Sequence, residues 1–297
     1  AGMMAGAATV NFNEDTYEDF NGFYGAVSTY GSFSYLKYGP MRLFSQIAQD
    51  SQLKVGKVIW VAGHSGPETA EDSRTHFGIF APGVTQLFPD GHVINLYPWE
   101  HNEVAPSLAA ALSTDVQLIA LHLTRPPVMI PDREALGMAS HMDAAKGAYI
   151  IKDFDPSMDK EGVVIVRGTS STNSIVQLLP QLIQEGPNVK VVAAVSWELF
   201  QRRSKEYRNS VISGSEWHDA MIITNGALQL MYKWIANRIV EEYSMSSDFD
   251  NQWRTGGSLD QIVAEAHLDP DSIWKGINRF AKNRKKRLNV LKASLPV

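Results

Sequence analysis

Apolar and polar residues follow two alternating patterns along this 297-residue chain. Short runs rich in β-branched residues predict buried strands over 57–63, 92–97, 116–124, 162–168, 189–195 and 220–226. Segments with an apolar residue at every third or fourth position predict helices over 107–113, 171–186, 198–212 and 228–243. Strands that alternate with helices are typical of parallel sheets covered by helices on both faces. The pattern therefore predicts an α/β protein.

This alternation stops in the middle of the chain, over 125–162, where Pro, Met, Asp and Gly are frequent. Within this interval, GAYIIKDF at 147–154 predicts a small hairpin. A chain of this length with 44% apolar residues can bury two cores. We therefore predict two three-layer α/β domains with mostly parallel sheets, joined by a linker that holds the hairpin, over residues 1–135, 161–297 and 136–160 respectively.

Charge and composition exclude several classes of partner. The 27 basic and 32 acidic residues give a net charge of −5, so no overall positive field favours nucleic acid or anionic membranes. The chain has no cysteine, which excludes disulfides, thiolate metal ligands and cysteine nucleophiles. No apolar stretch approaches the ~18 residues that span a bilayer. We therefore expect a soluble protein of the cytoplasm or of an organelle, whose partners are small molecules and protein chains.

The segment HSGPETAEDSRTH at 64–76 gathers two histidines and three carboxylates directly after a predicted strand. One interpretation is a hydrolase, because GHSG at 63–66 resembles the first part of the nucleophile elbow G-x-S-x-G, with Ser65 as the nucleophile. Pro67 stands where this elbow has its second glycine, a position that needs a small residue. Pro67 therefore argues against a hydrolase.

A second interpretation is a metal site, because imidazole nitrogens and carboxylate oxygens are common metal ligands. The candidate ligands are His64, Glu68, Glu71, Asp72 and His76. Their spacing does not match the helical pattern H-E-x-x-H, and the two histidines are twelve positions apart in a loop. The spacing therefore gives little support to this interpretation.

The third interpretation rests on a longer resemblance. VAGH at 61–64, followed by AEDSRTHF at 70–77, resembles the transketolase pattern in which a strand ends in Thr-His and a loop leads to Gly-Glu-Asp-Gly-Pro-Thr-His-Gln. Other segments resemble motifs of the same family in the same order: STYGSF at 28–33, LYPWEHNEV at 96–104, HLTR at 122–125, SWELFQRRSKEYRNSVI at 196–212 and DFDNQWRTGGSLDQIVAEAHLDPDSI at 248–273. The chain is therefore similar to the pyrimidine-binding and C-terminal domains of transketolases.

This resemblance implies a transferase of the pentose phosphate pathway. Transketolases transfer a two-carbon ketol unit between sugar phosphates with thiamine diphosphate and Mg²⁺, and the cofactor supplies the nucleophilic carbon and the electron sink. By resemblance, Tyr30 and Phe33 bind the cofactor by covering its aminopyrimidine ring. Leu36 stands where the family has a third aromatic residue. No residue of this chain is assigned to the metal.

Four polar residues act on the substrate, by the same resemblance. His76 is catalytic and binds the substrate oxygen that gains charge, since an imidazole titrates near neutral pH. Asp72 is catalytic and accepts a hydrogen bond from a sugar hydroxyl. His64 and Arg125 bind the terminal phosphate, and His64 is also counted as catalytic. Arg74 replaces a family proline nearby, which leaves the donor and acceptor sugars open.

In transketolases, the glutamate that activates the cofactor lies just before the segment that resembles AGMMAGAA at 1–8. The diphosphate and metal signature lies still further towards the N-terminus in the family. We therefore expect activity only together with an N-terminal part, carried by a second transketolase subunit or an N-terminal fragment, in a homodimer or a heterotetramer. The alternatives are the β-type component of a 2-oxo-acid dehydrogenase or a deoxyxylulose phosphate synthase, and a non-catalytic transketolase-like partner.

Overall fold

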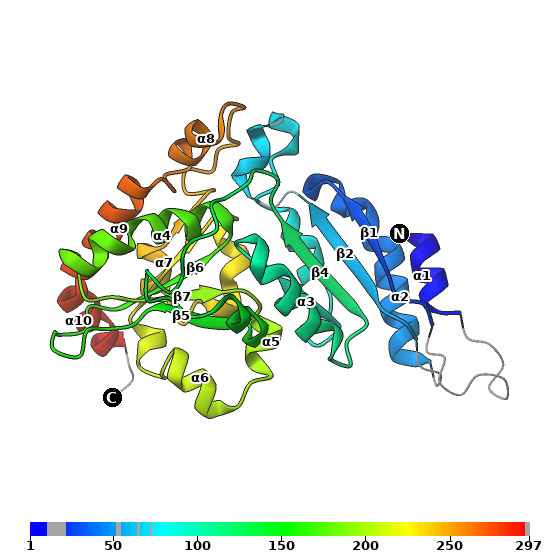
Figure 1. Ribbon diagram of the computed structural model, residues 1–297, viewed down its shortest axis with the longest axis horizontal. Coiled ribbons are helices and arrows are strands. Elements are labelled where there is room, and N and C mark those ends of the chain that lie inside the picture. The colour runs from blue at the N-terminus through cyan, green and yellow to red at the C-terminus, as the bar shows by residue number, and fades with distance from the viewer. Residues whose placement is uncertain (11–21, 52–54, 64–65, 72, 295–297) are drawn as a thin grey trace.

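The computed structural model describes residues 1–10, 22–51, 55–63, 66–71 and 73–294. These residues form two α/β units, each built around its own sheet (Figure 1). The predicted α/β class with mostly parallel sheets is confirmed. Among the described residues, no helix has the length and apolar character needed to cross a membrane.

Four parallel strands make up the first sheet, in the order β1 (Gly25–Thr29), β2 (Val58–Gly63), β4 (Leu118–Leu123) and β3 (Val93–Leu96). Successive side chains of a strand point to opposite faces, so each strand contributes to two cores. Val58 and Trp60 pack with Met41 and Phe44 on one face, whereas Ile119 belongs to the core on the other face. The first face is covered by α1 (Gly2–Ala8) and α2 (Tyr38–Asp50), and the second by α3 (Val104–Leu112).

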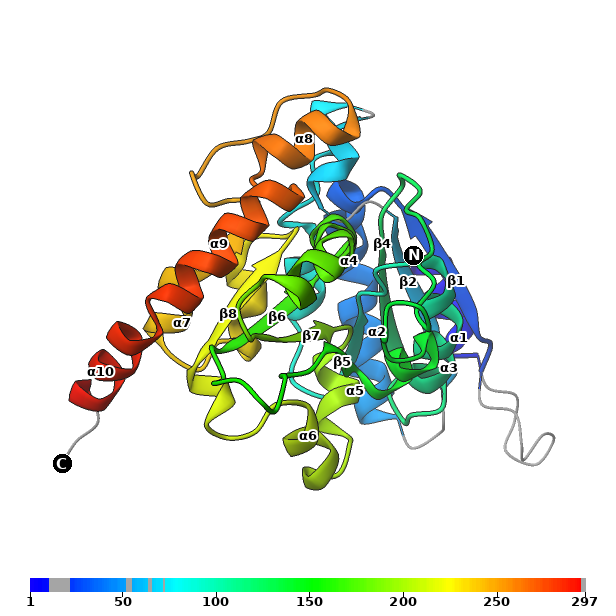
Figure 2. The ribbon, with the colours of Figure 1, turned by 60° about the vertical axis from the view of Figure 1, so that its left-hand side comes forward.

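The second sheet is mixed, in the order β5 (Ala148–Lys152), β7 (Lys190–Ala194), β6 (Val163–Arg167), β8 (Ala220–Thr224) and β9 (Met245–Ser246). Only β5 runs antiparallel to its neighbour. Val164 packs with Ile277 on one face, and Ile165 packs with Phe200 on the other. The first face is covered by α4 (Thr169–Gln184), α8 (Leu259–Glu265) and α9 (Pro270–Lys282), and the second by α5 (Trp197–Gln201), α6 (Lys205–Val211) and α7 (Arg238–Tyr243) (Figure 2).

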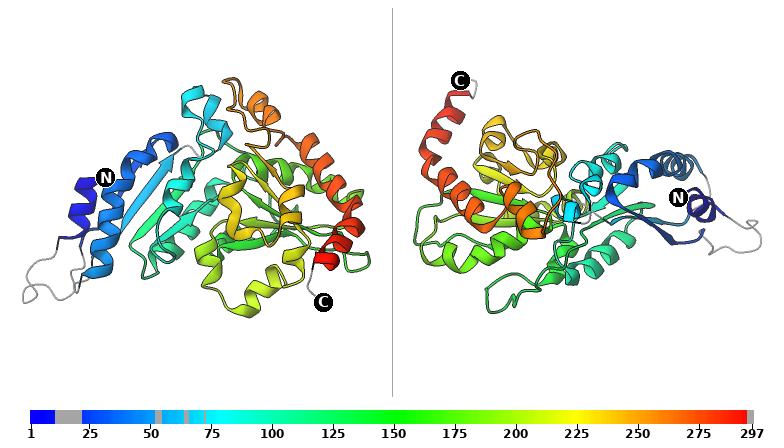
Figure 3. Two further views of the ribbon diagram at one scale, coloured as in Figure 1. Left: turned by 180° about the vertical axis from the view of Figure 1, so that it is seen from behind. Right: turned by 90° about the horizontal axis from the view of Figure 1, so that it is seen from above.

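Short 3-10 helices form many of the connections: η1 (Gly31–Lys37), η2 (Pro67–Glu71), η3 (Arg74–His76), η4 (Ala81–Gln86), η5 (His101–Glu103), η6 (His141–Lys146), η7 (Glu216–His218) and η8 (Leu228–Trp234). Helix α10 (Arg284–Ser294) lies at the opposite end of the molecule from α1 (Figure 3). Asp219 holds α10 through ion pairs of 2.6 Å to Arg284 and to Arg287.

The prediction of a hairpin at 147–154 is wrong. This segment forms β5, which pairs with β7 in the second sheet. An isolated two-stranded hairpin is marginally stable in water, whereas β5 at the edge of this sheet also buries Tyr149 and Ile151 in the core of the second unit. The predicted domain limits, 1–135 and 161–297, stay a prediction, with β5 joined to the sheet of the second unit.

Two predicted helices are interrupted by capping residues. In the segment predicted at 198–212, the Ser204 hydroxyl accepts a hydrogen bond from Tyr207 N at 3.2 Å and begins α6 as a new helix. In the segment predicted at 228–243, the Asn237 side chain accepts hydrogen bonds at the start of α7, after η8 has ended. Side-chain oxygens of this kind satisfy the free N–H groups of a first helical turn, so they favour a new helix over a continued one.

Candidate functional site

The candidate site lies at the carboxyl edge of the first sheet. Strands β1, β2 and β4 are parallel neighbours, so the residues that follow them meet at one edge. Tyr30 follows β1, the segment 64–76 follows β2, and Arg125 follows β4. This is the edge at which open α/β sheets bind their ligands.

Tyr30, Phe33 and His76 form an aromatic cluster at this edge. The Tyr30 and His76 rings stack, with their centroids 4.7 Å apart and 15° between their planes. The Phe33 ring lies edge to face with both, 6.1 Å from Tyr30 and 6.4 Å from His76 between centroids. Tyr30 is 44% exposed and Phe33 is 45% exposed, whereas the core ring of Phe44 is 1% exposed. The aromatic cluster therefore presents ring surface to solvent.

Buried Thr69 shapes the loop that carries His76. The Thr69 hydroxyl lies within hydrogen-bonding distance of two carbonyl oxygens, 3.0 Å from Gly66 O and 2.5 Å from His76 O. It also accepts a hydrogen bond from Gly78 N at 3.2 Å. His76 itself ends η3, where its N–H donates to Ser73 O at 2.8 Å. These bonds close the loop around one hydroxyl and hold His76 at its end.

Glu68 fastens the same loop to the second unit. Its carboxylate is buried and accepts hydrogen bonds from Ser170 N at 2.8 Å and from Asn225 Nδ2 at 3.0 Å. Burial raises the pKa of Glu68, and the hydrogen bonds from Ser170 and Asn225 act in the opposite direction. Gly66, with φ of +110°, leaves room for the carboxylate, because a Cβ there would overlap Glu68 Oε2. The second unit therefore fixes the start of the loop that ends at His76.

Of the site residues predicted by resemblance, the structure brings Tyr30, Phe33 and His76 together. Arg125 is exposed and lies at the same sheet edge, two residues beyond the end of β4. His64 and Asp72 lie outside the described residues. The roles predicted for these residues therefore stay predictions.

Lys37 is a charged residue of this edge that the sequence did not single out. It is 6% exposed, and its ammonium donates hydrogen bonds to Val27 O at 2.9 Å and to Val61 O at 3.1 Å. Burial lowers the pKa of Lys37 to about 8. The one sequence signal is its place among the aromatic residues that surround it in η1. Lys37, the last residue of η1, therefore connects the middle of β1 to the middle of β2.

The other two interpretations of the segment 64–76 gain no support. Glu68, a candidate metal ligand, uses its carboxylate to bind Ser170 and Asn225. Within the part of the chain that the structure describes, no group of three or more His, Cys, Asp or Glu side chains could hold a metal ion. Ser65, the nucleophile of the hydrolase interpretation, lies outside the described residues.

The fold and the site define an α/β protein of two sheet-based units, with an exposed cluster of aromatic and histidine rings at the carboxyl edge of the first sheet. Residues 147–247 match the family model of the transketolase-like TK C-terminal domain. This match extends from β5 to β9 and so covers the sheet of the second unit.

Curated relatives extend the match. The chain is 32% identical to the chloroplastic transketolase of Craterostigma plantagineum over 169 residues, which are 56% of this chain and 30% of that protein. It is 30% identical to the chloroplastic transketolase of Spinacia oleracea over 192 residues, which are 64% of this chain and 24% of that protein. The chain thus spans less than a third of either relative. The chain is therefore similar to transketolases, and its residues 147–247 are similar to their C-terminal domain.

Solved transketolase structures share the fold. A mutant transketolase of Pichia stipitis in complex with xylulose 5-phosphate superposes with a TM-score of 0.69 at 20% identity, over 89% of this chain and 34% of that one. A split-gene transketolase, described as an inactive β4 tetramer, superposes with a TM-score of 0.60 at 16% identity, over 95% of this chain and 81% of that one. At these identities, the likeness shows the fold alone.

Proposed function

We propose that this chain is part of a transketolase that transfers a two-carbon ketol unit between sugar phosphates, using thiamine diphosphate and Mg²⁺. The proposal rests on one observation above all: Tyr30, Phe33 and His76 cluster at the carboxyl edge of a sheet in a transketolase homologue. The pathway is then the pentose phosphate pathway. We place the protein in the cytoplasm or an organelle, and the two relatives named above are chloroplastic.

The aromatic cluster fits one half of the cofactor. Exposed rings of Tyr30 and Phe33 can cover a planar aminopyrimidine and exclude water from it. His76 stacks on Tyr30, which keeps its imidazole beside the same ring. By resemblance, the diphosphate and metal signature of the family lies outside the segments that this chain matches. The chain therefore supplies residues for the ring of thiamine, and we assign the diphosphate to a different stretch of polypeptide.

The residues of this chain would hold protons and orient the substrate. Thiamine diphosphate, when bound, supplies the nucleophilic carbon and the electron sink. A ring nitrogen of His76 would donate a hydrogen bond to the substrate oxygen that gains negative charge. The Arg125 guanidinium would bind the terminal phosphate through paired hydrogen bonds, with His64 as its second ligand. Asp72 would accept a hydrogen bond from a sugar hydroxyl.

A partner chain completes this proposal. The split-gene transketolase is described as inactive when its β chains assemble as a tetramer. By analogy, we propose that this chain joins a second transketolase subunit or an N-terminal fragment, in a homodimer or a heterotetramer. The partner would bring the diphosphate and metal ligands to the exposed side of the aromatic cluster.

A ketol-transfer assay tests the proposal directly. The chain is assayed by itself and as the native assembly isolated with it, with thiamine diphosphate, Mg²⁺, a ketose phosphate donor and an aldose phosphate acceptor. We expect turnover from the assembly and none from the isolated chain. Turnover by the isolated chain would contradict the assignment of the diphosphate to a partner.

The same assay separates the alternatives. Turnover with a 2-oxo acid in place of the ketose phosphate donor would indicate the β-type component of a 2-oxo-acid dehydrogenase or a deoxyxylulose phosphate synthase. An assembly that retains thiamine diphosphate but turns over neither class of substrate would indicate a non-catalytic partner. Arg74 is exposed and lies in η3 with His76. A third outcome is therefore a changed sugar preference, which a panel of donor sugars measures.

A further inference from the structure

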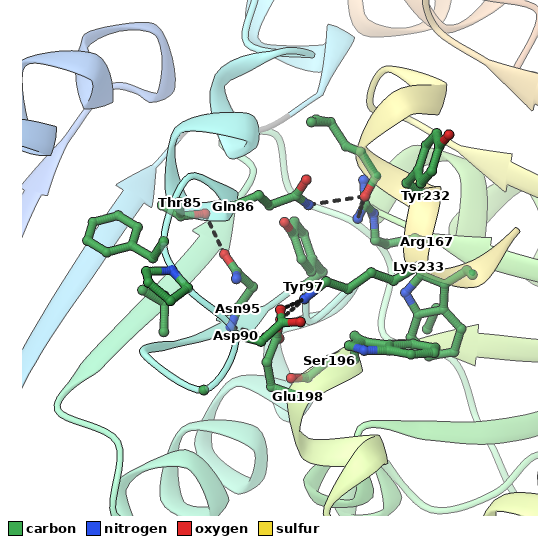
Figure 4. Close-up of a pocket in the computed structure, with 18 residues that line it drawn as sticks. Thr85, Gln86, Asp90, Asn95, Tyr97, Arg167, Ser196, Glu198, Tyr232 and Lys233 are labelled. Atoms are coloured by element: carbon green, nitrogen blue, oxygen red, sulfur yellow. Dashed lines mark hydrogen bonds and ion pairs between the residues drawn. The ribbon is translucent and has the colours of Figure 1, made fainter. Parts of the chain in front are cut away.

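A cavity of about 220 Å³ lies between the two units and shares no lining residue with the aromatic cluster (Figure 4). On the side of the first unit, the lining residues lie between Thr85 in η4 and Tyr97, which directly follows β3. The second unit lines it with Arg167 at the end of β6, with the segment 194–198 and with η8. At about 30 Å³ for each water, this space holds roughly seven waters or one small molecule.

Arg167 places a buried positive charge in the wall of this cavity. It is 4% exposed, and its guanidinium carbon lies 4.3 Å from the centroid of the Tyr97 ring. Its Nη1 donates a hydrogen bond of 2.9 Å to Leu230 O, a neutral acceptor. Burial lowers the pKa of Arg167, and the charge of Glu198 acts in the opposite direction without a direct ion pair among the described residues. The guanidinium therefore makes one hydrogen bond to a neutral acceptor and has further N–H groups that can bind an anion.

Tyr97 offers a second donor in the same wall. Its hydroxyl is buried and makes no hydrogen bond of ordinary geometry among the described residues, although the Gln86 side chain lies near enough to oppose the effect of burial on its pKa. Burial raises the pKa of Tyr97, so the hydroxyl keeps its proton at neutral pH and can donate it. The Tyr97 ring contacts both Arg167 and His122. The imidazole of His122 stacks on it, with the ring centroids 4.5 Å apart and 9° between the ring planes. These two contacts restrict the position of the ring and so that of its hydroxyl.

The opposite side of the cavity carries one ammonium and two carboxylates, those of Lys233, Asp90 and Glu198. Lys233 Nζ lies 2.5 Å from Asp90 Oδ1 and 3.8 Å from Glu198 Oε1. Glu198 is mostly buried, and its Oε2 accepts a hydrogen bond from Asn95 N at 3.1 Å. Figure 4 shows Glu198 and Lys233 facing the same space as Tyr97. The cavity thus has an anion-binding side, formed by Arg167 and Tyr97, and a side with a carboxylate that can accept a hydroxyl hydrogen.

We propose that this cavity binds a small hydroxylated oxyanion, which is either a hydroxycarboxylate or a phosphate monoester. Its anionic oxygens pair with the Arg167 guanidinium and accept a hydrogen bond from the Tyr97 hydroxyl. Its own hydroxyl donates to Glu198. Because the lining comes from both units, the ligand holds the two units in one arrangement and raises the temperature of unfolding.

Titration calorimetry with four probes tests this site: D-glycerate, glycerol 3-phosphate, inorganic phosphate and neutral glycerol. We expect one of the two hydroxylated oxyanions to bind at least about tenfold more tightly than glycerol, since a charge-assisted hydrogen bond is lost in the neutral probe. Tighter binding of D-glycerate identifies a carboxylate ligand, and tighter binding of glycerol 3-phosphate identifies a phosphate ester. Equal weak binding of both oxyanions and of glycerol overturns the proposal.

Variants locate the binding. Arg167→Met should weaken binding of the preferred probe by about tenfold or more, and Tyr97→Phe by a few-fold, because the latter keeps the ring and removes one donor. Arg202→Met, which breaks an exposed ion pair with Asp115, is the matched control and should leave binding unchanged. Binding that is lost in Arg125→Met but kept in Arg167→Met would place the ligand at the first sheet instead, and would overturn the proposal.

Folding of the variants is checked by circular dichroism. Where Arg167→Met does not fold, Tyr97→Phe decides, because this change keeps the buried ring and removes only its hydroxyl. A Tyr97→Phe protein that binds the preferred probe as tightly as the wild type overturns the proposal. A few-fold loss of affinity in that variant, with an unchanged unfolding temperature in the absence of the probe, supports it.

Discussion

Glu68 in the first unit accepts a hydrogen bond from the backbone N–H of Ser170 in the second unit, at 2.8 Å and in the first turn of α4. This bond connects the loop of His76 to the second sheet, and Asn225 adds a second bond to the same carboxylate. The first turn of a helix favours a negative charge, since its N–H groups lack partners within the helix. One carboxylate thus couples the candidate site to the fold of the other unit.

We predict that Glu68→Ala lowers the free energy of unfolding by about 1–3 kcal/mol, because Ser170 N and Asn225 Nδ2 lose their acceptor while buried. Glu68→Gln should cost less, since the amide oxygen can still accept from Ser170 N. Urea denaturation measures both changes. Glu71→Ala, an exposed change on the same η2, is the control, and a Glu68→Ala protein as stable as that control would contradict the prediction.

His122 should make the protein sensitive to acid. Burial, assisted by the charge of Arg167, lowers the pKa of His122 to about 3, from 6.5 for an unburied imidazole. Between these two pH values the unfolded chain binds a proton that the folded chain does not. The free energy of unfolding therefore falls as the pH drops from 6.5 towards 3, by about 1.4 kcal/mol per pH unit from this residue.

Urea denaturation of the wild type and of His122→Gln at pH 7.5, 6.5, 5.5 and 4.5 measures this contribution. The Gln variant should show a shallower loss of stability below pH 6.5. His101→Gln, which changes an exposed histidine, should leave the slope unchanged. Equal slopes for the wild type and His122→Gln would mean that His122 is protonated in the folded protein.

Lys37 should act at the alkaline end of the pH range. Burial lowers its pKa from 10.5 to about 8, so between pH 8 and 10.5 the unfolded chain binds the additional proton. The free energy of unfolding from this residue therefore rises as the pH increases through that interval. Thermal unfolding at pH 7, 8, 9 and 10 should show this rise in the wild type and its loss in Lys37→Met. A rise of the same size in Lys37→Met would refute the assignment.

Arg133 joins the two units through a buried network of charges. It pairs with Glu100 and with Glu103 at 2.9 Å, and Tyr149 of β5 also donates to Glu103. We predict that Arg133→Met lowers the free energy of unfolding by about 3–5 kcal/mol, because it leaves buried carboxylates without a counter-ion. Urea denaturation of Arg133→Met is compared with Arg238→Met.

The Arg238 control breaks an exposed pair with Glu241 and should cost at most about 1 kcal/mol. Adding Glu103→Gln to Arg133→Met should restore part of the loss, since one unpaired charge disappears. Equal losses for Arg133→Met and Arg238→Met would show that solvent screens the network.

In the assembly proposed above, His76 and Tyr30 should affect different steps of ketol transfer. His76→Ala should lower kcat by about a hundredfold or more, the usual contribution of a proton-transfer group, with little change in cofactor affinity. Tyr30→Leu should instead weaken binding of thiamine diphosphate several-fold, because a flat ring contact is lost. Steady-state kinetics and a cofactor titration separate these effects. Tyr35→Leu, in the helix η1 that follows Tyr30 but outside the aromatic cluster, is the control. Loss of cofactor from His76→Ala would reverse the two roles.

The sequence by itself located most of the strands of both sheets. Runs predicted at 162–168, 189–195 and 220–226 contain β6, β7 and β8, because a strand buried on both faces must be apolar along its whole length. Resemblance to a family then pointed to Tyr30, Phe33 and His76, which the structure brings together. Strands β1 and β9 and helices α1 and α2 were not predicted, and for β1 the short run GAVST gave little signal.

Only the tertiary structure decided which charges are buried and what they bind. Glu68, Lys37 and Arg167 resemble ordinary polar positions in the sequence, yet each is less than 9% exposed. The partners of Glu68 lie 102 and 157 positions away, at Ser170 and Asn225. Periodicity and capping act over a few residues, whereas burial and hydrogen-bond partners depend on segments that meet only when the chain has folded. The pKa of these groups, and the cavity beside Arg167, are therefore properties of the packed units.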